Sequence, residues 1–346
     1  MNEPEVNAPL TASTDHSVPA SIRRSTLSDL AKRVALRSEI GVFTALVVLV
    51  SIIGAFNPNF VSVSSTSNIG EQAALYGMSA LGMVFLLSMR EIDLSVGAIY
   101  GLTITAAALL MRAGIDPWLA AVAGLLVGVA LGAMNGLAAN FLRIPTIIVT
   151  LGTLSMFRGL DLVVTHGQAV SGLPINHPFF TELGGTPLGV TVSVWIFVIT
   201  ALVLTVVYGS TRYGYLVRAI GSNEEAARWS GIPIGRIRLV TLMLVGGLSA
   251  LSGMATLAYF QSSDPLLGSG YELQAIAAAV IGGTGLGGGR GSIIGALLGA
   301  LLIGVISSGL IQFGVSGDWS TFLTGAVIIL AVALDGLIRR RQSREI

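Results

Sequence analysis

Long apolar segments, separated by short polar loops, recur along the chain from residue 40 to residue 338. A helix needs about 20 mostly apolar residues to cross a bilayer. Charged residues make up only 11% of the chain, whereas soluble domains carry about 25%. The sequence therefore predicts an all-α integral membrane protein with about ten transmembrane helices, of which the eighth is short or broken. The expected segments are 40–56, 73–89, 94–112, 117–138, 145–164, 190–208, 238–259, 272–283, 291–312 and 320–338.

The basic residues favour one orientation of these segments. If the N-terminus is cytoplasmic, ten crossings return the C-terminus to the cytoplasm. Of the 19 Lys and Arg, only Arg112 and Arg158 then lie outside the cytoplasmic parts. Cytoplasmic loops of membrane proteins carry such an excess of Lys and Arg. Dropping any one segment would reverse every later loop, so we expect both termini in the cytoplasm.

The chain is expected to form one membrane domain with two polar tails. Residues 1–38 are rich in Ser, Thr and Pro and are expected to form a disordered cytoplasmic tail, whose role stays open. Residues 39–338 form the transmembrane domain, with a cytoplasmic loop at 209–237, and residues 339–346 form a basic cytoplasmic tail. No apolar signal-peptide core precedes residue 40.

Composition and motifs argue against catalysis by this chain. It has no cysteine, which excludes disulfides, and its three histidines are too scattered for a histidine-based metal site. Neither a G-x-S-x-G nor an H-E-x-x-H motif is present. The membrane segments also lack the cluster of polar residues that membrane enzymes usually show. We therefore expect neither catalytic residues nor metal ligands.

A polar island at residues 221–231 separates the sixth and seventh segments. Ser222 and Glu225 form an S-x-x-E capping box, and two carboxylates lie in the first turn, where the helix dipole favours them. Gly231 suits the left-handed residue that ends a helix, and Pro233 bars continuation. A helix of about eight residues is unstable alone in water. We therefore expect a partner protein to support it.

The glycine-rich run at residues 282–292 contains a G-x-G-x-x-G pattern at Gly283, Gly285 and Gly288. This pattern indicates dinucleotide binding only between a strand and a helix, and here it joins two apolar helices. Gly289 in place of Lys after Gly288 also excludes a phosphate loop. An interrupted helix of this kind can line a translocation path. A flexible cytoplasmic turn is an equally good interpretation, and both stay open.

Two sets of glycines recur every four residues and predict close helix packing. They are Gly124, Gly128, Gly132 and Gly136, and then Gly291, Gly295 and Gly299.

Ionisable residues inside or beside the segments have structural interpretations. The charged residues at 90–95, here called the charged knot, are interpreted as a hairpin whose opposite charges pair with each other. A proton or ion relay is the alternative, although no chain of intramembrane acids continues from this stretch. Arg158 and Asp161 are expected to form an ion pair at an outer helix end. Glu71 and Glu272 are interpreted as single acids that cap outer helix ends.

Several stretches, in the right order over roughly residues 40–338, carry a family resemblance. They are residues 91–97, 135–136, 144–153, 157–160, 211–214, 221–232, 268–273 and 277–299. With them the chain resembles the permease subunits of bacterial ATP-binding-cassette importers for ribose and other simple sugars. One departure is that the family commonly has two glycines before the Ile-Asp-Leu-Ser stretch, where this chain has Arg90 and Glu91.

The resemblance implies that the chain neither hydrolyses ATP nor carries a cofactor. It would be a multi-pass subunit of the bacterial inner membrane, in contact with lipid and paired with a second permease copy or a paralogue. A tandem-cassette ATPase, which binds ATP and Mg, would dock on the cytoplasmic side, and a periplasmic solute-binding protein on the other. No nucleic-acid partner is expected.

By its position, the polar island matches the coupling helix of the family, which would pass cassette closure to the membrane helices. The expected ATPase-coupling residues are Ser222, Asn223, Glu224, Glu225, Ala226, Ala227, Arg228, Ser230 and Gly231. The expected pathway or gating residues are Gly282, Gly283, Thr284, Gly287, Gly288, Gly289, Asp93 and Asn135.

The function implied is import of a small sugar, such as a ribose-like monosaccharide, driven by a separate ATPase. One alternative is an importer of the same class for an autoinducer or another non-sugar solute. The other is an ion-coupled secondary transporter, which usually needs intramembrane ionisable residues. The central segments are nearly devoid of such residues.

Overall fold

The computed structural model describes residues 38–315 and, beyond them, 319, 322–323, 325–326 and 329. The predicted tails, except for residue 38, and most of segment 320–338 lie outside the described residues. Within the described part, every regular element is a helix and there is no strand. A single isolated β-bridge among these residues pairs Val170 with Ser263.

Nine of the predicted segments are helices in the described part of the chain. They are α2 (Ser38–Phe56), α3 (Val63–Ser88), α4 (Val96–Arg112), α5 (Pro117–Leu142), α6 (Thr146–Thr165), α8 (Val192–Ser210), α11 (Ile234–Phe260), α12 (Tyr271–Ile281) and α13 (Ile293–Gln312). Short helices lie in the connections: η1 (Pro58–Val61), α7 (Pro178–Leu183), η2 (Pro187–Gly189), α9 (Arg212–Ser222) and α10 (Glu224–Trp229).

Seven of the described helices are long and apolar enough to cross a membrane: α2, α3, α5, α6, α8, α11 and α13. Two apolar helices, α4 and α12, are shorter. The short length of α12 agrees with the predicted short eighth segment. The prediction of an all-helical integral membrane protein is therefore confirmed.

α3 begins at Val63, well before residue 73 where the apolar run begins. Ser62 caps the helix, since its hydroxyl accepts a hydrogen bond from Ser65 N at 3.3 Å. The polar first turns stay helical because Ser65, Ile69 and Glu71 are buried against neighbouring helices. The connection between the first two long helices is therefore shorter than the interval 57–72 between the first two predicted segments.

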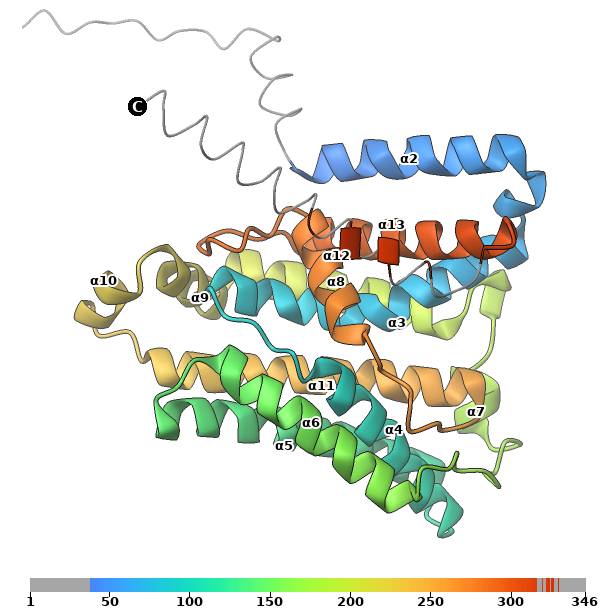
Figure 1. The fold of residues 1–346 in the computed structure, drawn as a ribbon, viewed down its shortest axis with the longest axis horizontal. Coiled ribbons are helices and arrows are strands. Elements are labelled where there is room, and N and C mark those ends of the chain that lie inside the picture. Colours follow the sequence, from blue (N-terminus) through green and yellow to red (C-terminus); the bar gives the residue numbers. More distant parts are fainter. Residues whose placement is uncertain (1–37, 316–318, 320–321, 324, 327–328, 330–346) are drawn as a thin grey trace, which may run out of the picture.

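The long helices lie roughly alongside one another (Figure 1). α2 runs along one edge, α11 lies in the middle, and α5 and α6 form the opposite edge. α12 crosses the view at a steep angle to α13. α9 and α10 project at one end of the bundle, here called the α10 end, and α7 lies at the other.

The predicted close packing at the glycine repeats is confirmed. A Cβ on Gly132 of α5 would overlap Leu242 O of α11, and a Cβ on Gly246 of α11 would overlap Gly128 O of α5. On the other repeat, a Cβ on Gly299 of α13 would overlap Ala278 O of α12. Backbones approach closely only where small residues allow it, so these glycines set the distances between the helices.

Candidate functional site

The polar island forms two helices rather than one. α9 continues through Ser222, and α10 starts only at Glu224. Asn223, with an extended backbone, is the N-cap of α10: its Oδ1 accepts a hydrogen bond from Ala226 N at 3.0 Å. The predicted capping box of Ser222 and Glu225 is therefore wrong. Because Ser222 still belongs to α9, its hydroxyl donates back to Arg218 O at 2.9 Å.

The other end signals of the island are confirmed. Glu224 and Glu225 lie in the first turn of α10, and Arg228 pairs with Glu224 at 2.9 Å. Gly231 has φ 75°, in the left-handed region that ends a helix.

The outer face of α10 is open. Of the predicted coupling residues, Ser222, Asn223, Glu224, Glu225, Ala226, Arg228, Ser230 and Gly231 are exposed. Ala227 is buried and faces the bundle, so it does not belong to this open face. Trp229, which the sequence-based set omits, has 84% of its surface exposed. A large aromatic residue in a short charged helix is the signal that could have identified it.

Three segments that are distant in sequence meet at the α10 end. Gly289 N donates to Ser88 O at 2.8 Å, which joins the glycine-rich run to the end of α3. A Cβ on Gly221 would overlap Ser88 O, so the end of α9 packs onto the same carbonyl. A Cβ on Gly288 would lie 2.8 Å from Gly221 O. The structure therefore brings the start of the predicted coupling residues against Gly288 and Gly289 of the predicted pathway residues.

The glycine-rich run connects α12 to α13 as a compact turn. Gly283, Gly288 and Gly289 have positive φ angles. Thr284 is fully buried, and its Oγ1 accepts a hydrogen bond from Ser292 N at 3.4 Å. The remaining predicted residues of the run differ in exposure: Gly282 is buried and Gly287 is exposed. The run is thus held by specific contacts on several sides.

Asp93 and Asn135 are linked through Ser95. Asp93 Oδ1 accepts hydrogen bonds from Ser95 N at 2.7 Å and Ser95 Oγ at 2.6 Å, and Asn135 Nδ2 donates to Ser95 Oγ at 2.8 Å. All three side chains are fully buried. Asp93 Oδ2 and Asn135 Oδ1 find no hydrogen-bond partner among the described residues. Burial raises the pKa of Asp93 to about 6, against the lowering effect of its hydrogen bonds from Ser95.

Glu91 pairs with other helices rather than within the charged knot. Glu91 Oε1 lies 2.5 Å from Arg238 Nε of α11, and Thr146 Oγ1 of α6 donates to Glu91 Oε2 at 3.0 Å. Arg238 Nη1 also donates to Asn140 Oδ1 of α5 at 3.1 Å. The carboxylate thereby holds the loop between α3 and α4 to α6 and α11, and Arg238 extends the link to α5.

Arg158 and Asp161 do not form the predicted ion pair. Arg158 Nη1 instead donates to Ser269 Oγ at 2.8 Å, because the loop before α12 comes within its reach. Asp161 is buried and packs against Gly101 of α4. A Cβ on Gly101 would lie only 3.3 Å from Asp161 Oδ2.

Glu71 is not at a helix end, because α3 begins at Val63, and it is buried. The prediction of a surface cap there is wrong. Glu272 does lie in the first turn of α12, but it is only half-exposed and its Oε2 faces Gly97 of α4.

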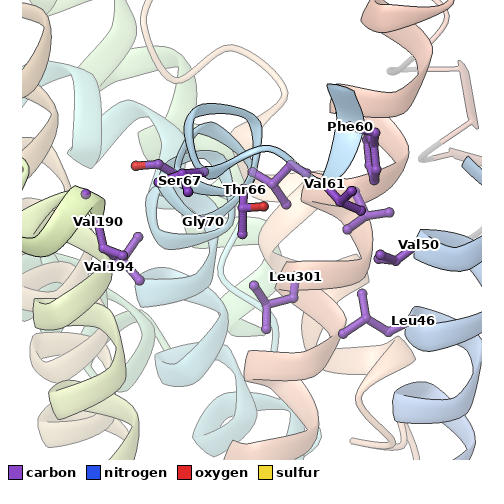
Figure 2. A pocket seen from close by; sticks show the side chains of 14 residues that line it. Leu46, Val50, Phe60, Val61, Thr66, Ser67, Gly70, Val190, Val194 and Leu301 are labelled. Carbon is purple, nitrogen blue, oxygen red and sulfur yellow. The ribbon is translucent and has the colours of Figure 1, made fainter. Parts of the chain in front are cut away.

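A pocket of about 500 Å³ lies away from these groups, between α2, α3, α8 and α13 (Figure 2). Its walls are aliphatic and aromatic apart from Thr66 and Ser67. A polyhydroxylated solute would lose its hydrogen bonds to water there without replacement. This pocket is therefore not a candidate solute path.

The family model described as branched-chain amino acid transport system / permease component matches residues 65–332. The chain is 40% identical to the ribose import permease protein RbsC of Bacillus subtilis (strain 168) over 297 residues, which cover 86% of this chain and 92% of the relative. It is 37% identical to the D-allose transport system permease protein AlsC of Escherichia coli (strain K12) over 302 residues, which cover 87% and 92%.

The chain is also 33% identical to the autoinducer 2 import system permease protein LsrC of Yersinia enterocolitica serotype O:8 over 307 residues, which cover 87% of this chain and 83% of the relative. No solved structure matches the chain.

The family model and these relatives span most of the chain, including α10, the glycine-rich run and the Asp93 loop. The relatives are permease components and not enzymes, and the apolar helices agree with a multi-pass protein of the inner membrane. The chain therefore belongs to this family of membrane permease components, as a permease of the simple-sugar class of ATP-binding-cassette importers.

Proposed function

We propose that the chain imports a small sugar, such as a ribose-like monosaccharide, across the inner membrane. The observation that carries this proposal is the similarity over most of the chain to permeases named for ribose and allose. ATP hydrolysis would take place in a partner ATPase, which holds the ATP and Mg. A periplasmic binding protein would deliver the solute at the end of the bundle opposite α10.

The proposed topology has ten transmembrane helices with both termini in the cytoplasm. It rests on nine helices at the predicted positions, on the apolar segment 320–338, and on the distribution of Lys and Arg. In this orientation the α10 end faces the cytoplasm.

The proposed docking surface for a tandem-cassette ATPase is the exposed face of α10. Its carboxylates Glu224 and Glu225 offer charge for basic groups on the partner. Trp229 is an apolar anchor of the kind that dominates protein interfaces. Asn223 holds the first turn in place for this contact.

The proposed pathway or gating groups are the glycine-rich run and the pair of Asp93 and Asn135. The closeness of the glycine-rich run to the end of α9 supports a role in passing movement from α10 to the membrane helices. A second permease copy or paralogue would complete the path, with lipid around the outer faces.

Autoinducer 2 is a second candidate solute, favoured by the similarity to an autoinducer 2 import permease. Both solutes are small and polar, and the choice between them would be made chiefly by the binding protein. Ion-coupled transport without an ATPase is not supported, because the chain belongs to the importer permease family.

The test uses vesicles that contain this permease together with the ATPase and the binding protein of its importer. We expect uptake of radiolabelled ribose or allose that requires ATP. Reversing two charges in E224K/E225K should abolish co-purification of the ATPase and uptake, while the binding protein still binds sugar. Normal uptake by E224K/E225K would contradict the docking assignment. Uptake of autoinducer 2 without uptake of either sugar would show that autoinducer 2 is the solute.

A further inference from the structure

Arg90 occupies a backbone position that favours glycine. Arg90 N donates to Leu87 O at 3.0 Å and Glu91 N to Leu86 O at 2.9 Å, which is the Schellman pattern that ends α3. Arg90 has φ 64°, in the left-handed region. Glycine adopts this conformation at no steric cost, whereas a residue with a Cβ does so less readily. Any advantage of arginine here must therefore come from its side chain.

The side chain of Arg90 joins two elements that are distant in sequence. Its Nε donates to Gly287 O of the glycine-rich run at 2.8 Å. Its Nη2 donates to the carbonyl oxygen of Ser222, the last residue of α9, at 3.1 Å; only Asn223 separates Ser222 from α10. Hydrogen bonds from a charged donor are stronger than neutral ones, and a planar guanidinium holds its two acceptors in a fixed geometry.

The next residue anchors the same turn to the bundle. Glu91 pairs with Arg238 of α11 and accepts a hydrogen bond from Thr146 of α6. Arg90 thus contacts the end of α9 and the glycine-rich run, whereas Glu91 contacts the membrane helices α6 and α11. The turn therefore connects the end of α9 and the glycine-rich run to α6 and α11.

We infer that Arg90 is a positioning residue that couples movement of α10 to the glycine-rich run and, through Glu91, to α6 and α11. The inference rests on the proposed docking of an ATPase at α10. Without the guanidinium, Ser222 O loses its side-chain link to Gly287. What then connects the segments is the main-chain bond of Gly289 N to Ser88 O and the packing of Gly221.

The variant R90G separates coupling from simple structural support. Glycine suits the left-handed turn, so R90G keeps the end of α3 and removes only the side-chain link. We expect R90G to melt close to the wild-type temperature and to co-purify with the ATPase. The solute transported per ATP should fall by about three- to tenfold, the size expected for losing exposed charge-assisted contacts.

The experiment measures ATP hydrolysis and sugar uptake in proteoliposomes that hold the full complex. R90K, which keeps the charge but has a single donor nitrogen in place of the guanidinium fork, should recover part of the coupling. R236A is the matched control, because Arg236 is exposed at the same end and has no side-chain hydrogen bond among the described residues; its coupling should be unchanged. Transport per ATP at the wild-type level in R90G would overturn the inference. A drop in the melting temperature of R90G large enough to explain its whole loss of transport would overturn it as well.

A covalent link provides an independent test. The chain has no cysteine, and a Cβ on Gly289 would stand 3.4 Å from Ser222 Cβ, close to the separation found in disulfides. In S222C/G289C/R90G, oxidation should restore transport per ATP and reduction should remove it again. A crosslink that forms and leaves coupling low would overturn the inference. If E224K/E225K transports normally, the docking assignment fails and this inference with it, whereas a normal R90G alone overturns only the role of Arg90.

Discussion

Asp93 lies in the loop between α3 and α4, where its carboxyl group meets Ser95 and is shielded from water. Its carboxyl is fully buried, and two hydrogen bonds from Ser95 do not offset the loss of water, so its pKa is raised to about 6. In the unfolded chain the same group titrates near 3.8. Between these values the folded protein binds more protons than the unfolded one, so the contribution of Asp93 to stability falls as pH rises.

Replacing the charge should remove this dependence. Asp93→Asn keeps an oxygen to accept the Ser95 hydrogen bonds but cannot ionise. Thermal unfolding in detergent from pH 4 to pH 7.5 should show a smaller decline for the variant, with a gain at pH 7.5 of up to about 3 kcal/mol. The exposed change Glu225→Gln serves as the control. Equal pH profiles for wild type and Asp93→Asn would contradict the assignment.

At the polar island, some end signals of α10 could be predicted from the sequence and its capping residue could not. The carboxylates in the first turn and Gly231 were predictable, because dipole and left-handed preferences are local. The capping residue was not, since Ser222 and Asn223 are both good caps. Which one acts depends on where α9 ends, and α9 ends against Ser88 and Gly289.

Pairs of helices are held at distances that their glycines allow. α5 and α11 approach so closely that a single methyl group at Gly132 would overlap Leu242 O. The four-residue spacing predicts such a face but not its partner. The early start of α3 does not follow from apolar runs, because the polar residues Ser65 and Glu71 near its start are covered by neighbouring helices.

Gly132→Ala should therefore destabilise the protein by about 1–3 kcal/mol through overpacking, although alanine favours a helix over glycine. Gly159→Ala in α6 is the matched control, because no atom lies within 4 Å of the added Cβ; it should be neutral or slightly stabilising. Melting temperatures in detergent compare the two variants. Equal effects would show that α5 and α11 have room to separate.

At the scale of the whole molecule, the bundle has two different ends. α9, α10 and the glycine-rich run gather at one end and α7 at the other (Figure 1). Nearly all predicted coupling and pathway residues lie at the α10 end. Orientation in the membrane therefore decides which partner can reach them.

The proposed orientation is testable because the chain lacks cysteine. E182C, exposed in α7, should react with a membrane-impermeant maleimide in intact spheroplasts. W229C, exposed in α10, should react only after the membrane is opened. Labelling of W229C in intact spheroplasts would show that the topology is the opposite of the one proposed. The ATPase could then not dock at α10.

Local patterns along the chain were enough to predict the class of the protein, the approximate positions of nine helices and the local character of the polar island. Apolar length, charge distribution and end preferences act over neighbouring residues, so they are visible without a fold. Other contacts could be known only from the packed helices: Arg90 meets Ser222 and Gly287, Glu91 pairs with Arg238, and Arg158 donates to Ser269. Those contacts join segments far apart in the chain, and they form only when helix packing brings the ends together.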